Sequence, residues 1–286
     1  DETLKRNGWY LMKHERATKE GSLTSTITIW TQSFLQEKPQ PKIGKQIKNL
    51  LKRAAEWAEI KDYTADYMLE EKKYSISHPS LYPTIAILDG NLTLTLPLDI
   101  SITTVMDALS HSFEAIWNKN SNQTSTDYAI SAICLILGNI EGLKRTPSDL
   151  SIRNKLLKAS TTAGLAFSNT TTAAAHSISY PLTIHYGIPH GIASSISLIP
   201  LLEINGEKIQ SSLEQIYEKN NLTYEKLVKL LKIIPENVIS YRLKDWGIPK
   251  NKLDKLSKES FTKGRMDNNI VDLSYEDVLS ILTIIY

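Results

Sequence analysis

Residues 102–116, ITTVMDALSHSFEAI, combine an apolar stripe and a polar one at the spacing of an α-helix. Asp107, His111 and Glu114 stand at positions i, i+4 and i+7, so a helix places all three on one face. The other face carries apolar side chains at helical spacing, namely Ile102, Val105, Met106, Leu109, Phe113 and Ile116. We therefore expect a long helix that packs through this stripe and presents a carboxylate and an imidazole one turn apart.

Two further histidines follow in unusual surroundings. His176 ends the run TTTAAAH, among small side chains, and His190 lies in a Pro-His-Gly turn 14 residues later. Taken singly, each is explained by a buried ring whose nitrogens bond to the backbone. Taken with Asp107 and His111, they form a mixed oxygen and nitrogen set that suits Fe(II) or Zn(II), and not Ca(II) or Mg(II). We predict one divalent-metal site formed by these four residues.

The chain divides into two regions that differ in their sequence pattern. Residues 1–98 contain short β-rich pieces, and residues 99–286 have long helical periodicity with short Gly and Pro breaks. The β-rich pieces are residues 25–30 (STITIW), 73–77 (KYSIS) and 84–88 (TIAIL). Between the first two, about residues 38–70 contain a breaker, KPQPK, and a basic amphipathic helix. That helix fits a membrane-surface or RNA-binding element, but a solvated face on a packed helix is the commoner cause.

Helix ends in the second region are marked by Pro, Gly and Ser. A segment rich in Ala, Ser and Thr, residues 151–180, is expected to end at Pro181. Pro189 and Gly191 predict the start of another helix. The sequence SYED at residues 274–277 is a capping signature before the last apolar helix.

Composition excludes several classes of function. A formal net charge of +2, from 33 basic and 31 acidic side chains, gives no global field that would recruit nucleic acid or an anionic membrane. The single cysteine, Cys134, lies in an apolar stretch and is expected to be a buried helix residue. No run of about 20 apolar residues occurs, and the first residues, DETLKRNGWYLMKHER, lack the apolar core of a signal peptide. We expect a soluble, reduced, cytoplasmic protein.

Several stretches resemble the iron-containing, or group III, alcohol dehydrogenase family. They are MDALSHSFEA (106–115), AGLAFSNTTTAAAHSISYPLTIHYGIPHG (163–191), SLYPTIAILDGNLTLTLP (80–97) and KGRMDNNIVDL (263–273). Within this family, the segments KKYSISHPSLYP and SISYPLT are most similar to the phosphonoacetaldehyde reductase branch. By this resemblance, the family's metal ligands correspond to Asp107, His111, His176 and His190.

The resemblance implies a mainly α, dehydroquinate synthase-like fold, in which an α/β nucleotide-binding domain precedes a multihelical metal-binding domain and faces it across a cleft. It also implies an oxidoreductase that uses Fe(II) or Zn(II) and NAD(P)H to reduce an aldehyde to an alcohol. The branch suggests phosphonoacetaldehyde and its alcohol, 2-hydroxyethylphosphonate. The choice of metal, of NADH or NADPH, and of oligomeric state stays open, with a homodimer as one candidate.

One part of the family pattern is absent. The chain has no Gly-rich turn after a strand that would hold dinucleotide phosphates. What remains is Gly21-Ser22-Leu23-Thr24, so Gly21, Ser22 and Thr24 are the predicted cofactor-binding residues. We therefore expect residues 1–98 to be a truncated and interrupted α/β domain. An alternative function follows: a catalytically silent, metal-binding remnant that acts as an interaction protein.

Five other side chains have two interpretations each. Tyr180, one helical turn after the third predicted ligand, replaces a proton-relay histidine of many relatives; it is either a catalytic proton donor or a buried tyrosine bonded to a carbonyl. His185 either lines the catalytic pocket or is a satisfied loop residue. Arg265 and Lys263 either bind an anionic substrate group or are solvated. Glu114 is either the general base of a metal-assisted hydrolysis or a carboxylate that supports a ligand.

Overall fold

A computed structural model describes residues 10–17, 23–30, 68–69, 72–73 and 88–286 of the chain. Contacts between residues divide the chain into two compact units, Asp1–Ile87 and Leu88–Tyr286. Each unit is described by itself.

The described part of the first unit consists of two antiparallel strand pairs. Strand β1 (Tyr10–Ala17) pairs with β2 (Leu23–Trp30) along its whole length, and β3 (Met68–Leu69) pairs with β4 (Lys72–Lys73). The predicted strand 25–30 therefore lies inside β2. The predicted basic helix, and most of the two other predicted β-rich pieces, lie outside the described residues.

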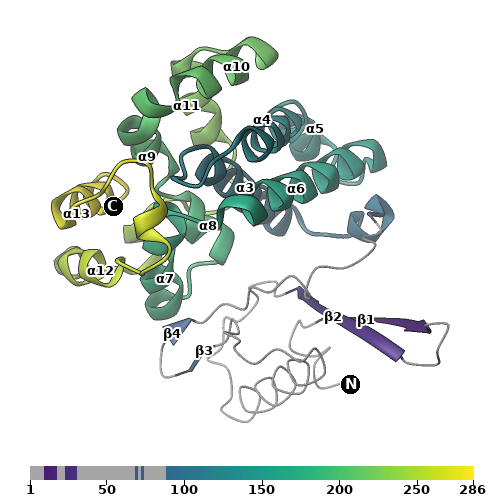
Figure 1. Ribbon diagram of the computed structural model, residues 1–286, viewed down its shortest axis with the longest axis horizontal. Coiled ribbons are helices and arrows are strands. Elements are labelled where there is room, and N and C mark those ends of the chain that lie inside the picture. Colours follow the sequence, from purple (N-terminus) through teal and green to yellow (C-terminus); the bar gives the residue numbers. More distant parts are fainter. Residues whose placement is uncertain (1–9, 18–22, 31–67, 70–71, 74–87) are drawn as a thin grey trace. The chain divides into compact units, whose positions relative to one another are not determined.

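The second unit is helical throughout (Figure 1). Its elements are η2 (Gly90–Thr93), α3 (Leu98–Ile116), α4 (Gln123–Leu137), α5 (Ile140–Arg145), α6 (Leu150–Thr170), α7 (Ala174–Tyr186), α8 (His190–Ser195), α9 (Leu198–Asn205), η3 (Gly206–Ile209), α10 (Gln210–Asn220), α11 (Tyr224–Ile233), η4 (Leu243–Trp246), η5 (Lys250–Lys252), α12 (Leu253–Glu259), η6 (Met266–Asn268) and α13 (Tyr275–Ile284). The mainly α fold class that the sequence predicts is confirmed.

The chain before α3 belongs with the helices. The backbone N–H of Gly90 in η2 donates to the side chain of Asn154 in α6, at 3.0 Å. Buried Arg153, also in α6, donates to the carbonyl oxygen of Leu96 and to the hydroxyl of Ser101 at the start of α3. These contacts tie residues 88–97, which the sequence analysis groups with the N-terminal region, to the helical unit.

Helix α3 is the central element of the helical core. It contacts α4, α6, α7 and α8, and all six apolar residues of the predicted stripe are buried: Ile102, Val105, Met106, Leu109, Phe113 and Ile116. Because α3 is covered on several sides, buried residues occupy more than the stripe, and Glu114 on the polar face has no exposed surface. A fully buried carboxylate needs a dedicated partner, since desolvating an unpaired charge is costly.

The predicted helix end at Pro181 is wrong. The chain breaks earlier, at residues 171–173 between α6 and α7, where Thr171 has φ 64° and ψ −179°, a conformation that disfavours side chains with a Cβ. Helix α7 then continues through Pro181 to Tyr186. Proline removes one intrahelical hydrogen bond, but Ile178, Pro181 and Leu182 are all buried, so packing holds the helix across it.

Other predicted boundaries are confirmed. Pro189 directly precedes α8, and Ser274 forms a capping box with Asp277 at the start of α13.

Cys134 lies in α4 as a free thiol, but it is only half-buried, not buried as the sequence predicts, and the amide of Asn220 donates to its sulfur. Among the described residues, no helix combines the length and the apolar character needed to cross a membrane.

Candidate metal centre

The four predicted metal ligands come together around the carboxylate of Asp107. Its Oδ1 lies 3.7 Å from Nε2 of His176 and 3.7 Å from Nε2 of His190. Its Oδ2 lies 3.9 Å from Nδ1 of His111, one turn later on α3. The structure thus joins two residues of α3 with one from α7 and one from α8, although up to 83 residues separate them in the sequence.

The imidazole rings are packed against one another. His111 stacks on Phe167 on one side, at 4.2 Å between ring centroids, and on His176 on the other, at 4.6 Å. His190 meets His176 edge-on at 5.2 Å. Asp107, His111 and His176 each offer one ligand atom, and these three atoms lie within 4.8 Å of one another. This packing fixes the rings, so little order remains to be imposed when a ligand binds.

Glu114 holds His176 in a defined orientation. Its Oε2 lies 2.5 Å from Nδ1 of His176, and its Oε1 accepts the backbone N–H of the same residue at 3.0 Å. Both side chains are buried, with 0% and 4% exposure. Because Glu114 engages Nδ1, the Nε2 atom faces Asp107. Glu114 is therefore committed to His176, which leaves the hydrolysis hypothesis without its general base.

The donor atoms suit a divalent cation. Nε2 of His176 is buried and has no hydrogen-bond partner within the described part of the chain. Its separation from Asp107 Oδ1, 3.7 Å, exceeds a hydrogen bond. Two ligands that each approach one cation at about 2.1 Å are separated by roughly 3.4 Å in a tetrahedral site. An orphaned imidazole nitrogen at this spacing from a carboxylate oxygen therefore fits the group that the sequence predicts.

The carboxylates and imidazoles of the cluster stabilise one another's charged forms. Burial alone would lower the pKa of His176, but the carboxylates of Glu114 and Asp107 outweigh it and raise the pKa to about 9. Burial alone would raise the pKa of Asp107, but His111, His190 and His176 hold that pKa well below its usual value. The pKa of Glu114 is likewise lowered, because the charge and hydrogen bonds of His176 overcome its burial. A bound cation would replace the proton of His176.

Gly191, predicted from the sequence only as part of a helix start, and Ser194, which had no predicted role, bring α8 against α3. A Cβ on Gly191 would lie 2.1 Å from the carbonyl oxygen of Thr103 and 3.0 Å from Cβ of Asp107, so only glycine fits. Ser194, one turn later, donates its hydroxyl to Asp107 Oδ1 at 2.8 Å. The close approach places His190 beside Asp107. The only sequence signal was the run of small residues GIASS after His190.

Tyr180 and Arg265 lie against each other. Tyr180 follows His176 by four residues in α7, on the same face of the helix. Its hydroxyl oxygen accepts a hydrogen bond from Nε of half-buried Arg265, at 3.3 Å. Lys263, by contrast, is exposed. The structure therefore distinguishes Arg265, which contacts Tyr180, from Lys263, which is exposed; the sequence alone did not.

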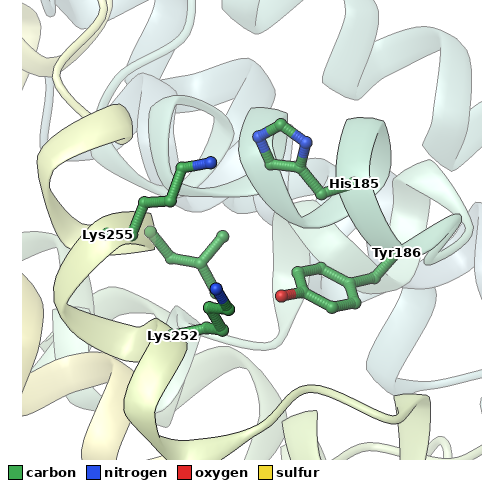
Figure 2. A pocket seen from close by; sticks show the side chains of 5 residues that line it. His185, Tyr186, Lys252 and Lys255 are labelled. Carbon is green, nitrogen blue, oxygen red and sulfur yellow. The ribbon is translucent and has the colours of Figure 1, made fainter.

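The structure does not bring His185 to this cluster. Nine residues of helix separate it from His176, on the order of 13 Å along the axis. Its Nε2 instead contacts Oε2 of Glu259 at 2.8 Å, with about a third of each side chain exposed. Figure 2 shows His185 and Tyr186 facing Lys252 of η5 and Lys255 of α12. These side chains line a cavity of about 210 Å³. The expectation that His185 lines the metal pocket is thus not met, because the C-terminal end of α7 packs against α12.

The helical unit also matches a known family. A family model described as "Fe-containing alcohol dehydrogenase family, C-terminal" matches residues 101–286. The chain belongs to this family. All four residues of the cluster lie within the matched segment.

Curated members of the iron-containing alcohol dehydrogenase family are similar over different lengths. Long-chain-alcohol dehydrogenase 1 of Geobacillus thermodenitrificans is 26% identical over 87% of this chain and 64% of its own length. The probable alcohol dehydrogenase EutG of Escherichia coli is 32% identical over 51% of this chain and 37% of its own length. The chain therefore spans less than two thirds of these relatives.

A solved structure of the family has a similar fold. Sulfoacetaldehyde reductase from Bifidobacterium kashiwanohense, in complex with NAD+, aligns with a TM-score of 0.68 and 26% identity. The alignment covers 75% of this chain and 57% of that protein. The fold of the iron-containing alcohol dehydrogenases is thus present in the described helical unit.

The predicted cofactor-binding residues lie outside the helical unit. Gly21 and Ser22 are not among the described residues, and Thr24 lies in β2, paired with Arg16 of β1. Their role as a dinucleotide site stays a prediction. The family match begins at residue 101, so it does not reach them.

Proposed function

We propose that this chain contains the metal-binding part of a metal-dependent, NAD(P)H-linked oxidoreductase that reduces an aldehyde to an alcohol. The observation that carries the proposal is the convergence of His111, His176 and His190 on the carboxylate of Asp107. Membership of the iron-containing alcohol dehydrogenase family supports the same reaction class.

Asp107, His111, His176 and His190 would hold the cation. Three imidazoles and one carboxylate favour Fe(II) or Zn(II) over hard, oxygen-preferring cations. A divalent metal bound here supplies Lewis acidity toward the carbonyl oxygen of the aldehyde. Glu114 fixes the tautomer of His176, and such supporting carboxylates raise the basicity of a ligating imidazole.

Tyr180 is the proposed proton donor. Its oxygen accepts a hydrogen bond from Arg265, and it stands one helical turn from His176. A bound NAD(P)H would supply the hydride for the carbonyl carbon, and the substrate oxygen would then need one proton. Tyr180 would supply that proton to the substrate oxygen, and solvent would restore it.

The proposed substrate is an aldehyde with an anionic group, of the phosphonoacetaldehyde kind. Two segments, KKYSISHPSLYP and SISYPLT, resemble the phosphonoacetaldehyde reductase branch. A structural neighbour is named as a reductase of sulfoacetaldehyde, which also has an acid group on a two-carbon aldehyde. Phosphonoacetaldehyde would give 2-hydroxyethylphosphonate.

The test begins with metal analysis of the purified chain, with His190→Ala as the variant. The proposal expects about one Fe or Zn per wild-type chain and a loss of at least tenfold in the variant. Equal metal content in both proteins would reject the site.

Fluorescence titration with NADH and NADPH separates the enzyme from the silent remnant. Saturable binding below about 1 mM, with aldehyde-dependent oxidation of the bound cofactor, would support the oxidoreductase. A chain that holds metal but binds neither dinucleotide would instead support the interaction protein.

A further inference from the structure

The loop at residues 263–269 is anchored to the turn that presents His176. The side-chain amide of Asn268 donates to the hydroxyl of Thr171 at 2.9 Å and to the carbonyl oxygen of Thr172 at 2.8 Å. These are the residues between α6 and α7, where Thr171 has its positive φ. Asn268 therefore connects the loop to the strained backbone that leads into the metal-ligand end of α7.

Further contacts fix the other side of the loop. Asn269 is fully buried and exchanges two amide hydrogen bonds with buried Asn205, at 2.9 and 3.2 Å. The backbone N–H of Lys119 donates to the carbonyl oxygen of Asn268 at 2.8 Å, directly after α3. A loop held from α3, α9 and the α6–α7 turn keeps its other side chains in defined positions.

Arg265, in this anchored loop, contacts Tyr180 of α7. Its Nε donates to Tyr180 at 3.3 Å, and its Nη1 donates to the carbonyl oxygen of Gly264 at 3.0 Å. Tyr180 shares a helix face with His176, one turn away. The guanidinium is therefore placed beside the proposed proton donor, which stands one helical turn from the metal-ligand His176.

We propose that Arg265 determines substrate specificity by binding the anionic group of the aldehyde while the carbonyl oxygen faces the Asp107 cluster. This inference rests on the proposed function. A planar guanidinium offers several N–H donors in a fixed fork, which matches the oxygen atoms of a phosphonate, sulfonate or carboxylate. Its half-buried position strengthens the attraction relative to an exposed lysine such as Lys263.

A binding experiment on the full chain loaded with Co(II) tests this inference without requiring turnover. The visible spectrum of bound Co(II) reports first whether the metal site forms. Calorimetric titration with 2-hydroxyethylphosphonate and with neutral 1-propanol then measures the preference for an anion. We expect the wild-type chain to bind the phosphonate at least tenfold more tightly than propanol.

Three variants assign the preference to a side chain. Arg265→Gln is expected to reduce it to less than twofold, and Arg265→Lys to restore part of it, because the charge returns without the fork. Lys263→Gln, which removes an exposed cation from the same loop, is the matched control and should keep the wild-type preference. Circular dichroism and the Co(II) spectrum verify that each variant folds and holds metal.

Different results overturn different statements. A wild-type chain without a Co(II) spectrum would remove the proposed function, and this inference with it. A normal Co(II) spectrum with no preference for the phosphonate would overturn only the role of Arg265. A preference that survives in Arg265→Gln, or that disappears equally in Lys263→Gln, would also overturn it.

Discussion

Helix α7 carries a histidine near each of its ends, each paired with a glutamate of another helix, and the two pairs lie in opposite environments. His176 and Glu114 are 2.5 Å apart with 4% and 0% exposure, whereas His185 and Glu259 are 2.8 Å apart with 31% and 34% exposure. Similar contact distances therefore have different consequences. The buried pair orients a nitrogen toward Asp107, while water competes for every atom of the exposed pair.

Replacing each histidine by alanine gives the largest expected contrast. His176→Ala removes a central ligand, so we expect metal content to fall from about one ion per chain to less than about 0.1. His185→Ala removes only a surface contact and should leave metal content unchanged. Elemental analysis of both purified variants measures this. Metal loss in both would mean that the two ends of α7 do not differ as described.

Replacing each glutamate sharpens the same comparison. Glu114→Gln keeps the shape but removes the charge that orients His176, so we expect metal affinity to drop about 10- to 100-fold. Its buried hydrogen bonds also suggest a loss of about 2 kcal/mol in the free energy of unfolding. Glu259→Gln should change that free energy by less than about 0.5 kcal/mol. Competition with a metal chelator and urea unfolding provide the measurements; equal effects of the two substitutions would contradict the assignment.

Gly191 lets α8 approach α3 closely, and a larger side chain at this position tests that contact. Gly191→Ala forces a methyl group onto Thr103, and we expect a destabilisation of about 1–3 kcal/mol with weaker metal binding. Gly164→Ala in α6 is the matched control. Among the described residues, no atom outside its own turn of helix lies within 4 Å of the added Cβ, so alanine there should stabilise the helix by up to about 1 kcal/mol. Thermal unfolding and metal titration of both variants measure these effects. Equal stability and equal metal affinity of the two variants would contradict the close packing of Gly191.

The metal-free chain should depend on pH in a defined direction. The pKa of His176 is raised from 6.5 to about 9, so its contribution to stability is complete below pH 6.5 and is lost as pH rises through 9. The lowered pKa of Glu114 contributes stability that is lost as pH falls below its usual 4.5. Urea unfolding after chelation, at about pH 6 and about pH 9.5, should therefore give the higher stability near pH 6.

Metal affinity should have the opposite trend, because the metal must displace the proton of His176. We expect affinity to rise with pH up to about 9. Glu114→Gln should weaken the pH dependence of both properties, and an unchanged dependence in this variant would assign it to other groups.

The sequence was most informative where one helix carries the pattern by itself. The spacing of Asp107, His111 and Glu114 and the apolar stripe of α3 predict a helix, and its burial is confirmed. Periodicity could not show that α3 is covered on several sides. The burial of Glu114, and its commitment to His176, therefore became evident only in the structure.

Features that depend on contacts distant in sequence were missed or wrong. Pro181 was expected to end a helix, but buried neighbours carry α7 past it. His185 and His190 are five residues apart, yet the turn between them sends them to different surroundings. The fit of Gly191 against Thr103 has only a weak local signal, the small residues GIASS, because it depends on the packing of two helices.

The central claim is that Asp107, His111, His176 and His190 share one cation. Anomalous X-ray diffraction at the absorption edge of the metal, from crystals of the metal-loaded chain, tests it most directly. The account predicts a single strong peak about 2.1 Å from the carboxylate of Asp107 and from one nitrogen of each of the three imidazoles. A peak elsewhere in the chain, or none between these four side chains, would contradict it.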